Sequence, residues 1–314
     1  MTTSVALCTY NGASYIQEQI ESILNQTMPV DEIVICDDGS TDDTLQIVNK
    51  LQQAATIDIR IYKNEGKLGV SNNFQKAINL CQGDIIFLSD QDDIWKPEKV
   101  EKISNYFDEH SDIEVVFSNA LLIEGDGSNS RALPGNLWDY TFRPVYRKMF
   151  NHGLQLECFL EGDIATGATM AIKKSFRTTI CTSFDTTLHD YSIAIIAVKD
   201  GKLGYVDNIL TKYRLHTGQT CSISKQSPFY SVYEQIYIID FFIKKHEFYG
   251  DCLTRAQFVK YRIKQSNRLF GPLNLISHTN QYVSLYGKMY FLTLSHDVSR
   301  WFHLMLKRFH LKRQ

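Results

Sequence analysis

The first 90 residues alternate between short apolar runs and segments whose apolar residues recur at helical spacing. The apolar runs have the length of strands and lie at residues 5–9, 33–36, 57–61 and 85–88. Strands joined by helix-length connections pair in parallel and place helices on both faces of one sheet. This order predicts an α/β domain with a mostly parallel, three-layered sheet.

The fourth apolar run ends in three carboxylates, those of Asp90, Asp92 and Asp93. Like charges crowded at the end of a buried strand repel one another unless a cation neutralises them. Hard divalent cations take oxygen ligands, and Mg²⁺ is usually held by one or two carboxylates together with substrate phosphates. We therefore predict that Asp90 and Asp92 bind Mn²⁺ or Mg²⁺ for a phosphate-bearing substrate. The alternative is an aspartate-rich turn at the start of a helix.

Two other predicted strands also end in polar residues. Thr9 and Asn11 follow the first strand, and Asp37 and Asp38 follow the second. Ligands of parallel α/β sheets bind outside the carboxyl ends of the strands, so we expect the three clusters to lie together. The sequence has neither a Walker phosphate loop nor a glycine-rich dinucleotide fingerprint after the first strand. A nucleotide would then be held by side chains and a metal.

Composition excludes several classes of protein. The formal net charge of -2 argues against nucleic acid as the main partner, and 44% hydrophobic residues suffice for a sizeable core. The 7 cysteines include no Cys-x-x-Cys pair, which favours buried thiols in a reducing compartment over disulfides or a zinc site. We find no signal-peptide pattern and no apolar stretch of about 18 residues, and we expect a cytoplasmic protein.

The second half of the chain is less regular. We expect a loop near the site, including Trp138, at residues 128–146, and an apolar helix at 193–198 that follows Asp190. The pattern changes near Pro228, after which segments with helical spacing are rich in aromatic and basic residues. Further strands are predicted at residues 113–117, 166–172, 204–206 and 213–216.

Several motifs follow one another in order along the chain. They are Cys8-Thr9-Tyr10-Asn11, Asp37-Asp38-Gly39-Ser40-Thr41-Asp42, Asn64-x-Gly66, Leu88-Ser89-Asp90-Gln91-Asp92-Asp93-Ile94-Trp95, Thr166-Gly167, His189-Asp190 and Tyr213-Arg214-x-His216. The ordered set resembles family 2 glycosyltransferases, inverting enzymes with the GT-A fold, in their bacterial rhamnosyltransferase-like branch. The chain departs from that branch at Ser192, where a second aromatic residue is usual, and at Gln219, where asparagine is common.

The resemblance implies a GT-A catalytic domain over residues 1–225 and a helical C-terminal extension over residues 226–314. The nucleotide-sugar half would span about residues 1–120 and the acceptor half about residues 121–225. The donor would be a nucleoside diphosphate sugar, either dTDP-rhamnose or a UDP-sugar, and the acceptor a glycan or lipid-linked glycan in bacterial surface polysaccharide synthesis. A divalent cation would stabilise the anionic leaving group, and a base would deprotonate the acceptor hydroxyl on the opposite face.

The resemblance also implies residue roles. Asp190 would be the catalytic base, although it could instead cap the helix that follows it. Asp92 would be the principal metal ligand, with Asp90 bound directly, through water or to the donor ribose. His216 would contact the metal or diphosphate, or be structural. The other residues expected to bind the nucleotide sugar are Thr9, Tyr10, Asn11, Asp38, Asn64, Gly66, Gln91, Gly167, His189 and Arg214.

The C-terminal segment and the reaction class leave alternatives open. Aromatic and basic residues at 290–313 fit a helix in a membrane interface, here the inner face of the plasma membrane, or a helix packed on the catalytic domain or on a homodimer partner. The competing functions are a sugar nucleotidyltransferase and an inactive module that binds sugar nucleotides or glycans. The nucleotidyltransferase lacks support because no glycine-rich, basic loop that could hold a triphosphate follows the first predicted strand.

Overall fold

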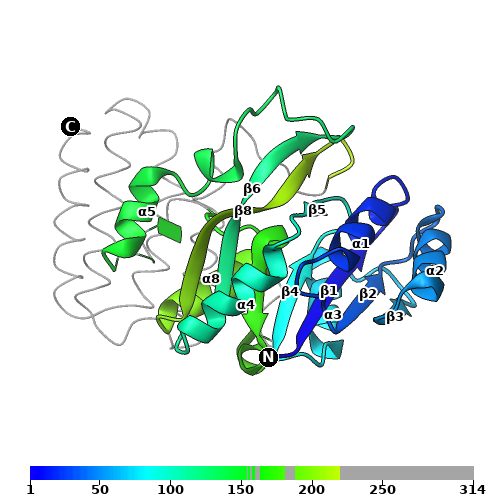
Figure 1. The fold of residues 1–314 in the computed structure, drawn as a ribbon, viewed down its shortest axis with the longest axis horizontal. Helices are drawn as coiled ribbons and strands as arrows, with labels where there is room; N and C mark the ends of the chain where they lie inside the picture. Colours follow the sequence, from blue (N-terminus) through cyan, green and yellow to red (C-terminus); the bar gives the residue numbers. More distant parts are fainter. Residues whose placement is uncertain (154, 156–157, 160–162, 181–187, 220–314) are drawn as a thin grey trace, which may run out of the picture. The chain divides into compact units, whose positions relative to one another are not determined.

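The computed structural model describes residues 1–219 apart from 154, 156–157, 160–162 and 181–187 (Figure 1). The predicted extension at 226–314, with its membrane and dimer alternatives, lies outside the described residues. No helix in the described part is long and apolar enough to cross a membrane.

One eight-stranded sheet organises the described residues, in the order β3-β2-β1-β4-β7-β6-β8-β5. Six of its strands run in one direction, and only β5 and β7 run in the other. The predicted α/β class with a mostly parallel sheet is therefore confirmed. The strands are β1 (Thr3–Thr9), β2 (Glu32–Asp37), β3 (Asp58–Lys63), β4 (Ile85–Ser89), β5 (Ile94–Trp95), β6 (Val115–Glu124), β7 (Met170–Lys173) and β8 (Leu203–Leu215).

Helices cover both faces of the sheet, as Figure 1 shows. Alternate strand residues such as Val5 and Leu7 form a core with α1, α2 and α4, and the opposite face of the sheet contacts α3 and α8. The helices are α1 (Ile16–Leu24), α2 (Thr44–Ala54), α3 (Val70–Leu80), α4 (Lys99–Glu109), α5 (Pro144–Asn151), α7 (Arg177–Ile180) and α8 (His189–Lys199), with 3₁₀ turns η1 (Leu137–Asp139), η2 (Gly167–Thr169) and η3 (Lys174–Phe176).

The second half differs from its predicted elements in two places. The strands expected at 204–206 and 213–216 are one strand, β8, whose register with β6 shifts on both sides of Asn119. The shift interrupts the apolar alternation, which is why the sequence pattern looks like two short strands. The segment expected to be a loop contains η1 and the start of α5, because Trp138 and Phe142 pack edge-to-face and bury the segment against Phe117 of β6.

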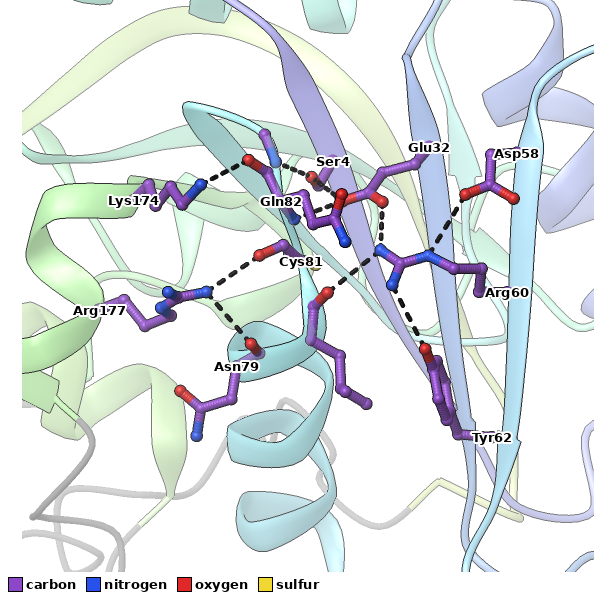
Figure 2. Close-up of polar contacts among 12 residues, drawn as sticks. Ser4, Glu32, Asp58, Arg60, Tyr62, Asn79, Cys81, Gln82, Lys174 and Arg177 are labelled. Atoms are coloured by element: carbon purple, nitrogen blue, oxygen red, sulfur yellow. Dashed lines mark hydrogen bonds and ion pairs between the residues drawn. The ribbon is translucent and has the colours of Figure 1, made fainter.

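A polar network lies at the end of the sheet where the parallel strands begin (Figure 2). The buried carboxylate of Glu32 accepts hydrogen bonds from the Ser4 hydroxyl and the Gln82 backbone N–H and forms an ion pair with Arg60. Arg60, Lys174 and Arg177 donate to the last carbonyls of α3 and the two residues after it. Cations at the carbonyl end of a helix favour its dipole, so this network fixes α3 in place.

Glu32 should stabilise the fold in a pH-dependent way. Burial alone would raise the pKa of Glu32, but hydrogen bonds from Ser4 and Gln82 and the charge of Arg60 lower it below the usual glutamate value. Its stabilisation is therefore complete above the ordinary pKa of about 4.3 and disappears as the pH falls through the lower folded-state value. Glu32→Gln should lower the free energy of unfolding at pH 7 by about 2 kcal/mol, measured by urea unfolding, and by less near pH 4.

Asp58→Asn is the matched control, since Asp58 pairs with the same Arg60 but its side chain is 62% exposed. We expect a change below about 1 kcal/mol for this variant. Equal effects of the two substitutions at pH 7 would contradict the assignment.

Candidate active site

The carboxyl ends of β1, β2 and β4 lie side by side, with Thr9 opposite Asp37 and Leu7 opposite Ser89. The predicted convergence of the polar clusters is therefore present. The oppositely directed β7 begins at the same edge, because it pairs antiparallel with β4. The turn η2 that precedes β7 thus brings residues from the second half of the chain to the same place.

Asp90, Asp92 and Asp93 form the loop between β4 and β5, which we call the acidic loop (residues 90–93). Burial and then the charges of Asp92 and Asp190 raise the pKa of Asp90 to about 8. Burial, together with Asp92 and Asp90, also raises the pKa of Asp93 well above its usual value. Within the described residues, the Asp90 carboxylate accepts no hydrogen bond. The loop therefore gathers three acidic side chains at the strand end, and Asp190 lies close enough for its charge to act on Asp90.

Arg214, 1% exposed, ties the acidic loop to its surroundings. Its Nε donates to the Asp92 carbonyl over 2.7 Å, and its backbone N–H donates to the Asp93 carboxylate over 3.0 Å. The other guanidinium nitrogens donate to the Gly125 carbonyl and to Glu18 on α1. All three guanidinium nitrogens of Arg214 donate to protein acceptors in this structure. Arg214 therefore holds the acidic loop in place.

His216 contacts the predicted metal ligand directly. Its Nε2 lies 2.9 Å from Oδ2 of Asp92, and its Nδ1 accepts a hydrogen bond from the Gly218 N–H over 3.2 Å. A neutral imidazole that accepts at Nδ1 carries its proton at Nε2, so His216 donates to Asp92 in this arrangement. The Gln219 side chain bridges the backbone of this turn, donating to the Arg214 carbonyl and accepting from the His216 N–H.

Asp38 fastens the loop at residues 64–69. Its Oδ1 accepts hydrogen bonds from Asn64 Nδ2 (3.0 Å) and Leu68 N–H (2.7 Å), and its Oδ2 accepts one from Gly69 N–H (2.9 Å). Asn64 in turn accepts a hydrogen bond from Lys76 over 2.7 Å. Asp38 and Asn64 are both buried, and together they hold this loop beside the end of β2.

Thr9, Asn11 and Asp37 build the adjoining turn. The Thr9 hydroxyl donates to Asp37 over 2.9 Å, and the other Asp37 oxygen accepts from the N–H groups of Gly39 and Ser40. Asn11 has a positive φ of 50° and its side chain accepts a hydrogen bond from the N–H of Thr41. The side chains of Thr9, Asn11 and Asp37 therefore shape the backbone of the strand ends.

Tyr10 and Gln91 join the first strand end to the acidic loop. The Gln91 side chain pairs with the Tyr10 backbone on both sides, with its oxygen 2.8 Å from the N–H and its nitrogen 3.1 Å from the carbonyl. The Tyr10 ring is 42% exposed, with the Lys67 ammonium 3.9 Å from its centroid. A Cβ at Gly12 would displace the Gln91 side chain from its pairing with Tyr10, whereas Gly66 is exposed with open space around it.

Asp190 lies in the first turn of α8. Its Oδ2 accepts a hydrogen bond from the Gly167 N–H of η2 over 2.9 Å, and its Oδ1 accepts one from the Tyr191 N–H over 2.8 Å. The carboxylate thus contacts the helix start, but the residue in the N-cap position is Leu188. Each oxygen keeps a lone pair, so the group can still accept a proton.

His189 packs beside Asp190. Its ring stacks on Phe74 of α3 at 4.0 Å between centroids, and burial lowers its pKa although the Asp190 charge opposes the shift. Within the described residues, neither ring nitrogen has a hydrogen-bond partner. In this structure His189 packs against Phe74.

The acidic loop has the chemistry of a divalent cation site. Asp90 and Asp92 offer carboxylate oxygens, and a cation would relieve the repulsion that raises the pKa of Asp90. Across the described part of the chain, no three His, Cys, Asp or Glu side chains form a ready-made metal centre. Two carboxylates completed by substrate phosphates suit Mg²⁺ or Mn²⁺ without a third protein ligand.

Sequence reasoning missed Lys99, a fully buried lysine in α4. Burial lowers the pKa of Lys99 to about 7, although Asp93 and Asp90 favour its charged form. The signal was its spacing, because Lys99 shares a helix face with the core residues Ile103 and Phe107. Glu18, which pairs with Arg214, was missed as well, and its pattern in the sequence carries no comparable sign.

The sequence profile of Glycosyl transferase family 2 matches residues 4–178. The chain belongs to this family. An uncharacterized glycosyltransferase of Haemophilus influenzae is 29% identical over 228 residues, which are 70% of this chain and 67% of the relative. Poly(ribitol-phosphate) beta-N-acetylglucosaminyltransferase TarS of Staphylococcus aureus is 33% identical over 144 residues, 45% of this chain and 24% of TarS.

Two solved structures of glycosyltransferases share the fold. S. aureus TarS 1-349 in complex with UDP-GlcNAc has a TM-score of 0.63 at 19% identity, covering 94% of this chain and 82% of that one. The mannosyltransferase PcManGT of Pyrobaculum calidifontis, in complex with GDP-Man and Mn2+, has a TM-score of 0.50 at 17% identity, covering 77% and 61%. The predicted GT-A fold is confirmed. The rhamnosyltransferase-like branch stays a prediction.

Gly167→Ala tests the packing of the Asp190 segment. A Cβ on Gly167 would lie 2.9 Å from Nε2 of His189 and 3.2 Å from Cβ of Asp190, so the start of α8 would have to shift. A shift of about 1 Å can reduce turnover about 100-fold, and we expect a loss of this order in sugar transfer. Nucleoside diphosphate affinity, measured by calorimetry, should stay within about threefold of wild type because the Gly167 N–H holds Asp190 and not a residue of the acidic loop. Wild-type turnover in this variant would contradict the packing argument.

Proposed function

We propose that this chain is an inverting glycosyltransferase that moves a sugar from a nucleoside diphosphate sugar to a glycan acceptor. The observation that carries the proposal is the placement of Asp190 within electrostatic reach of the acidic loop. One cluster of carboxylates suits the diphosphate with a divalent cation, and a separate carboxylate on another element suits the acceptor hydroxyl. Inverting displacement needs these two functions on opposite faces of the transferred sugar.

On the donor side, Asp90 and Asp92 would hold Mn²⁺ or Mg²⁺. When bound, the ion stabilises negative charge on the departing diphosphate as a Lewis acid. His216 donates to Asp92 and orients that carboxylate, and the Gly218 contact that sets its tautomer would have to change before Nε2 bound a metal. Arg214 holds the loop backbone, so the two carboxylates keep their places without a direct ion pair.

On the acceptor side, Asp190 would take the proton of the attacking hydroxyl. The N–H groups of Gly167 and Tyr191 orient its two oxygens. Neutral His189, packed behind it, adds no competing positive charge.

The nucleoside would lie against the ends of β1 and β2, where Thr9, Tyr10, Asn11 and Asp38 meet the loop at 64–69. Tyr10 offers an exposed aromatic face and Lys67 a cation beside it. Asp38 would hold the loop through its three hydrogen bonds, and the second lone pair of its Oδ2 could accept a hydrogen bond from a pyrimidine N–H.

Names of relatives suggest the donor and acceptor classes to test first. TarS is named as a poly(ribitol-phosphate) beta-N-acetylglucosaminyltransferase, and an Escherichia coli relative, 34% identical over 125 residues, is named chondroitin synthase. The alignments span only 24% and 18% of those proteins. We propose bacterial polysaccharide synthesis as the setting, with UDP-sugars tested before dTDP-rhamnose.

A donor panel tests the function. The protein is incubated with UDP-, dTDP- and GDP-sugars and Mn²⁺, Mg²⁺ or EDTA, with and without a glycan acceptor, and the released nucleoside diphosphate is measured. We expect metal-dependent release from one donor. In a parallel reaction with nucleoside triphosphates and sugar 1-phosphates, release of pyrophosphate would instead identify a nucleotidyltransferase. Absence of donor binding with every metal would count against the proposal.

Asp190→Asn and Asp92→Asn separate the two halves of the reaction. Asp190→Asn should lower turnover by at least about 100-fold and leave nucleoside diphosphate binding intact, because general base catalysis contributes about 10²- to 10⁴-fold. Asp92→Asn should weaken metal-dependent nucleotide binding itself. Asp108→Asn, an exposed aspartate on α4, is the control and should match wild type in both measurements. Full turnover in Asp190→Asn would show that another group is the base.

A further inference from the structure

Lys99 is an unexpected residue for its position. It is the first residue of α4 and has no exposed surface, on the face that carries Ile103 and Phe107 into the core. Burying an ammonium group is expensive unless its charge and its hydrogen-bond donors are matched. The reaction proposed above makes no use of Lys99, so its burial needs another explanation.

The Lys99 ammonium joins three separate elements. It donates to the Ala168 carbonyl of η2 over 2.8 Å and to the Thr211 hydroxyl of β8 over 3.0 Å. It also lies 4.0 Å from the centroid of the Trp95 ring in β5. All three contacts are with uncharged groups, so Lys99 forms no ion pair with a carboxylate in the described part of the chain.

Each of these elements leads to one half of the proposed site. Ala168 directly follows Gly167, whose N–H holds the Asp190 carboxylate. Trp95 ends the short strand that leaves the acidic loop, and it pairs in register with Thr211. Lys99 therefore connects the Asp190 segment with the far end of the acidic loop.

The charged groups that act on Lys99 are those of the acidic loop. Asp93 and Asp90 are the charged groups that favour its protonated form. Because its hydrogen bonds go to a carbonyl and a hydroxyl, Lys99 balances part of the carboxylate charge without occupying a carboxylate oxygen. The Asp90 oxygens stay free for a ligand, which a direct ion pair would prevent.

We infer that Lys99 is a positioning residue that holds η2, and through it Asp190, at a set separation from Asp90 and Asp92. The inference rests on the proposed function, since that separation matters only if Asp190 and the acidic loop act on the two sides of one sugar. The substitution Lys99→Met would keep the packing against Trp95 but lose both hydrogen bonds and the positive charge.

The test compares Lys99→Met, Lys99→Arg and Lys173→Met in the full chain. Lys173 is the matched control, because its ammonium also donates to a backbone carbonyl, Ser111, and lies 5.4 Å from the Phe107 ring, away from the site. Amide hydrogen exchange is measured over residues 166–170 and over β1 and β2. We expect exchange at 166–170 to speed up about tenfold in Lys99→Met, with β1 and β2 unchanged, and no change in Lys173→Met.

Kinetics give a second readout. We expect kcat of Lys99→Met to fall about 100-fold while nucleoside diphosphate affinity stays within about threefold, because the donor site remains and the base is displaced. Lys99→Arg should recover part of kcat, since it keeps the charge and can reach one of the two acceptors.

Unchanged exchange at residues 166–170 in Lys99→Met would overturn the inference, whatever the activity. So would equal losses of kcat and nucleotide affinity with faster exchange throughout the sheet, which would mark Lys99 as a general stabiliser. Failure of the wild-type protein to turn over any donor would count against the proposed function alone, because the exchange comparison needs no turnover.

Discussion

Repulsion among carboxylates at one edge of the sheet is the constraint on which the site depends. Asp90, Asp92 and Asp93 follow β4, and the charge of Asp190 reaches them from α8. Two buried basic side chains lie beside these carboxylates and offset part of the repulsion. Arg214 binds the loop backbone and Asp93, and Lys99 lies close enough for Asp90 and Asp93 to favour its charge.

The same edge shows how carboxylates divide between structure and ligand binding. Asp37 and Asp38 are almost fully engaged by hydroxyl, amide and backbone donors, so they form turns and fix the loop at 64–69. Asp90 has no such partner within the described residues. A carboxylate left unpaired at a buried strand end is stabilised by a bound cation. This contrast distinguishes structural aspartates from candidate ligand-binding aspartates better than sequence position does.

Much of the first half could be predicted from the sequence, because its elements are local. Apolar runs of strand length and helical spacing identified β1 to β4 and the helices between them, and parallel pairing followed from the connection lengths. The second half was harder. A register shift divided β8 into two apparent strands, and the aromatic packing of Trp138 and Phe142 turned an expected loop into η1 and part of α5. These depend on partners distant in the chain.

By itself, the sequence determined the fold class, the family and the candidate carboxylates Asp90, Asp92 and Asp190, because strand ends and ordered motifs are readable along the chain. Only the tertiary structure decided which polar residues support the site and which remain free. Hydrogen bonds to other parts of the protein engage the side chains of Arg214, Asn64 and Asp38. Lys99 links two segments about 70 residues apart. Hydrogen bonds between distant segments leave no periodic pattern, so their partners become known only when the chain is folded.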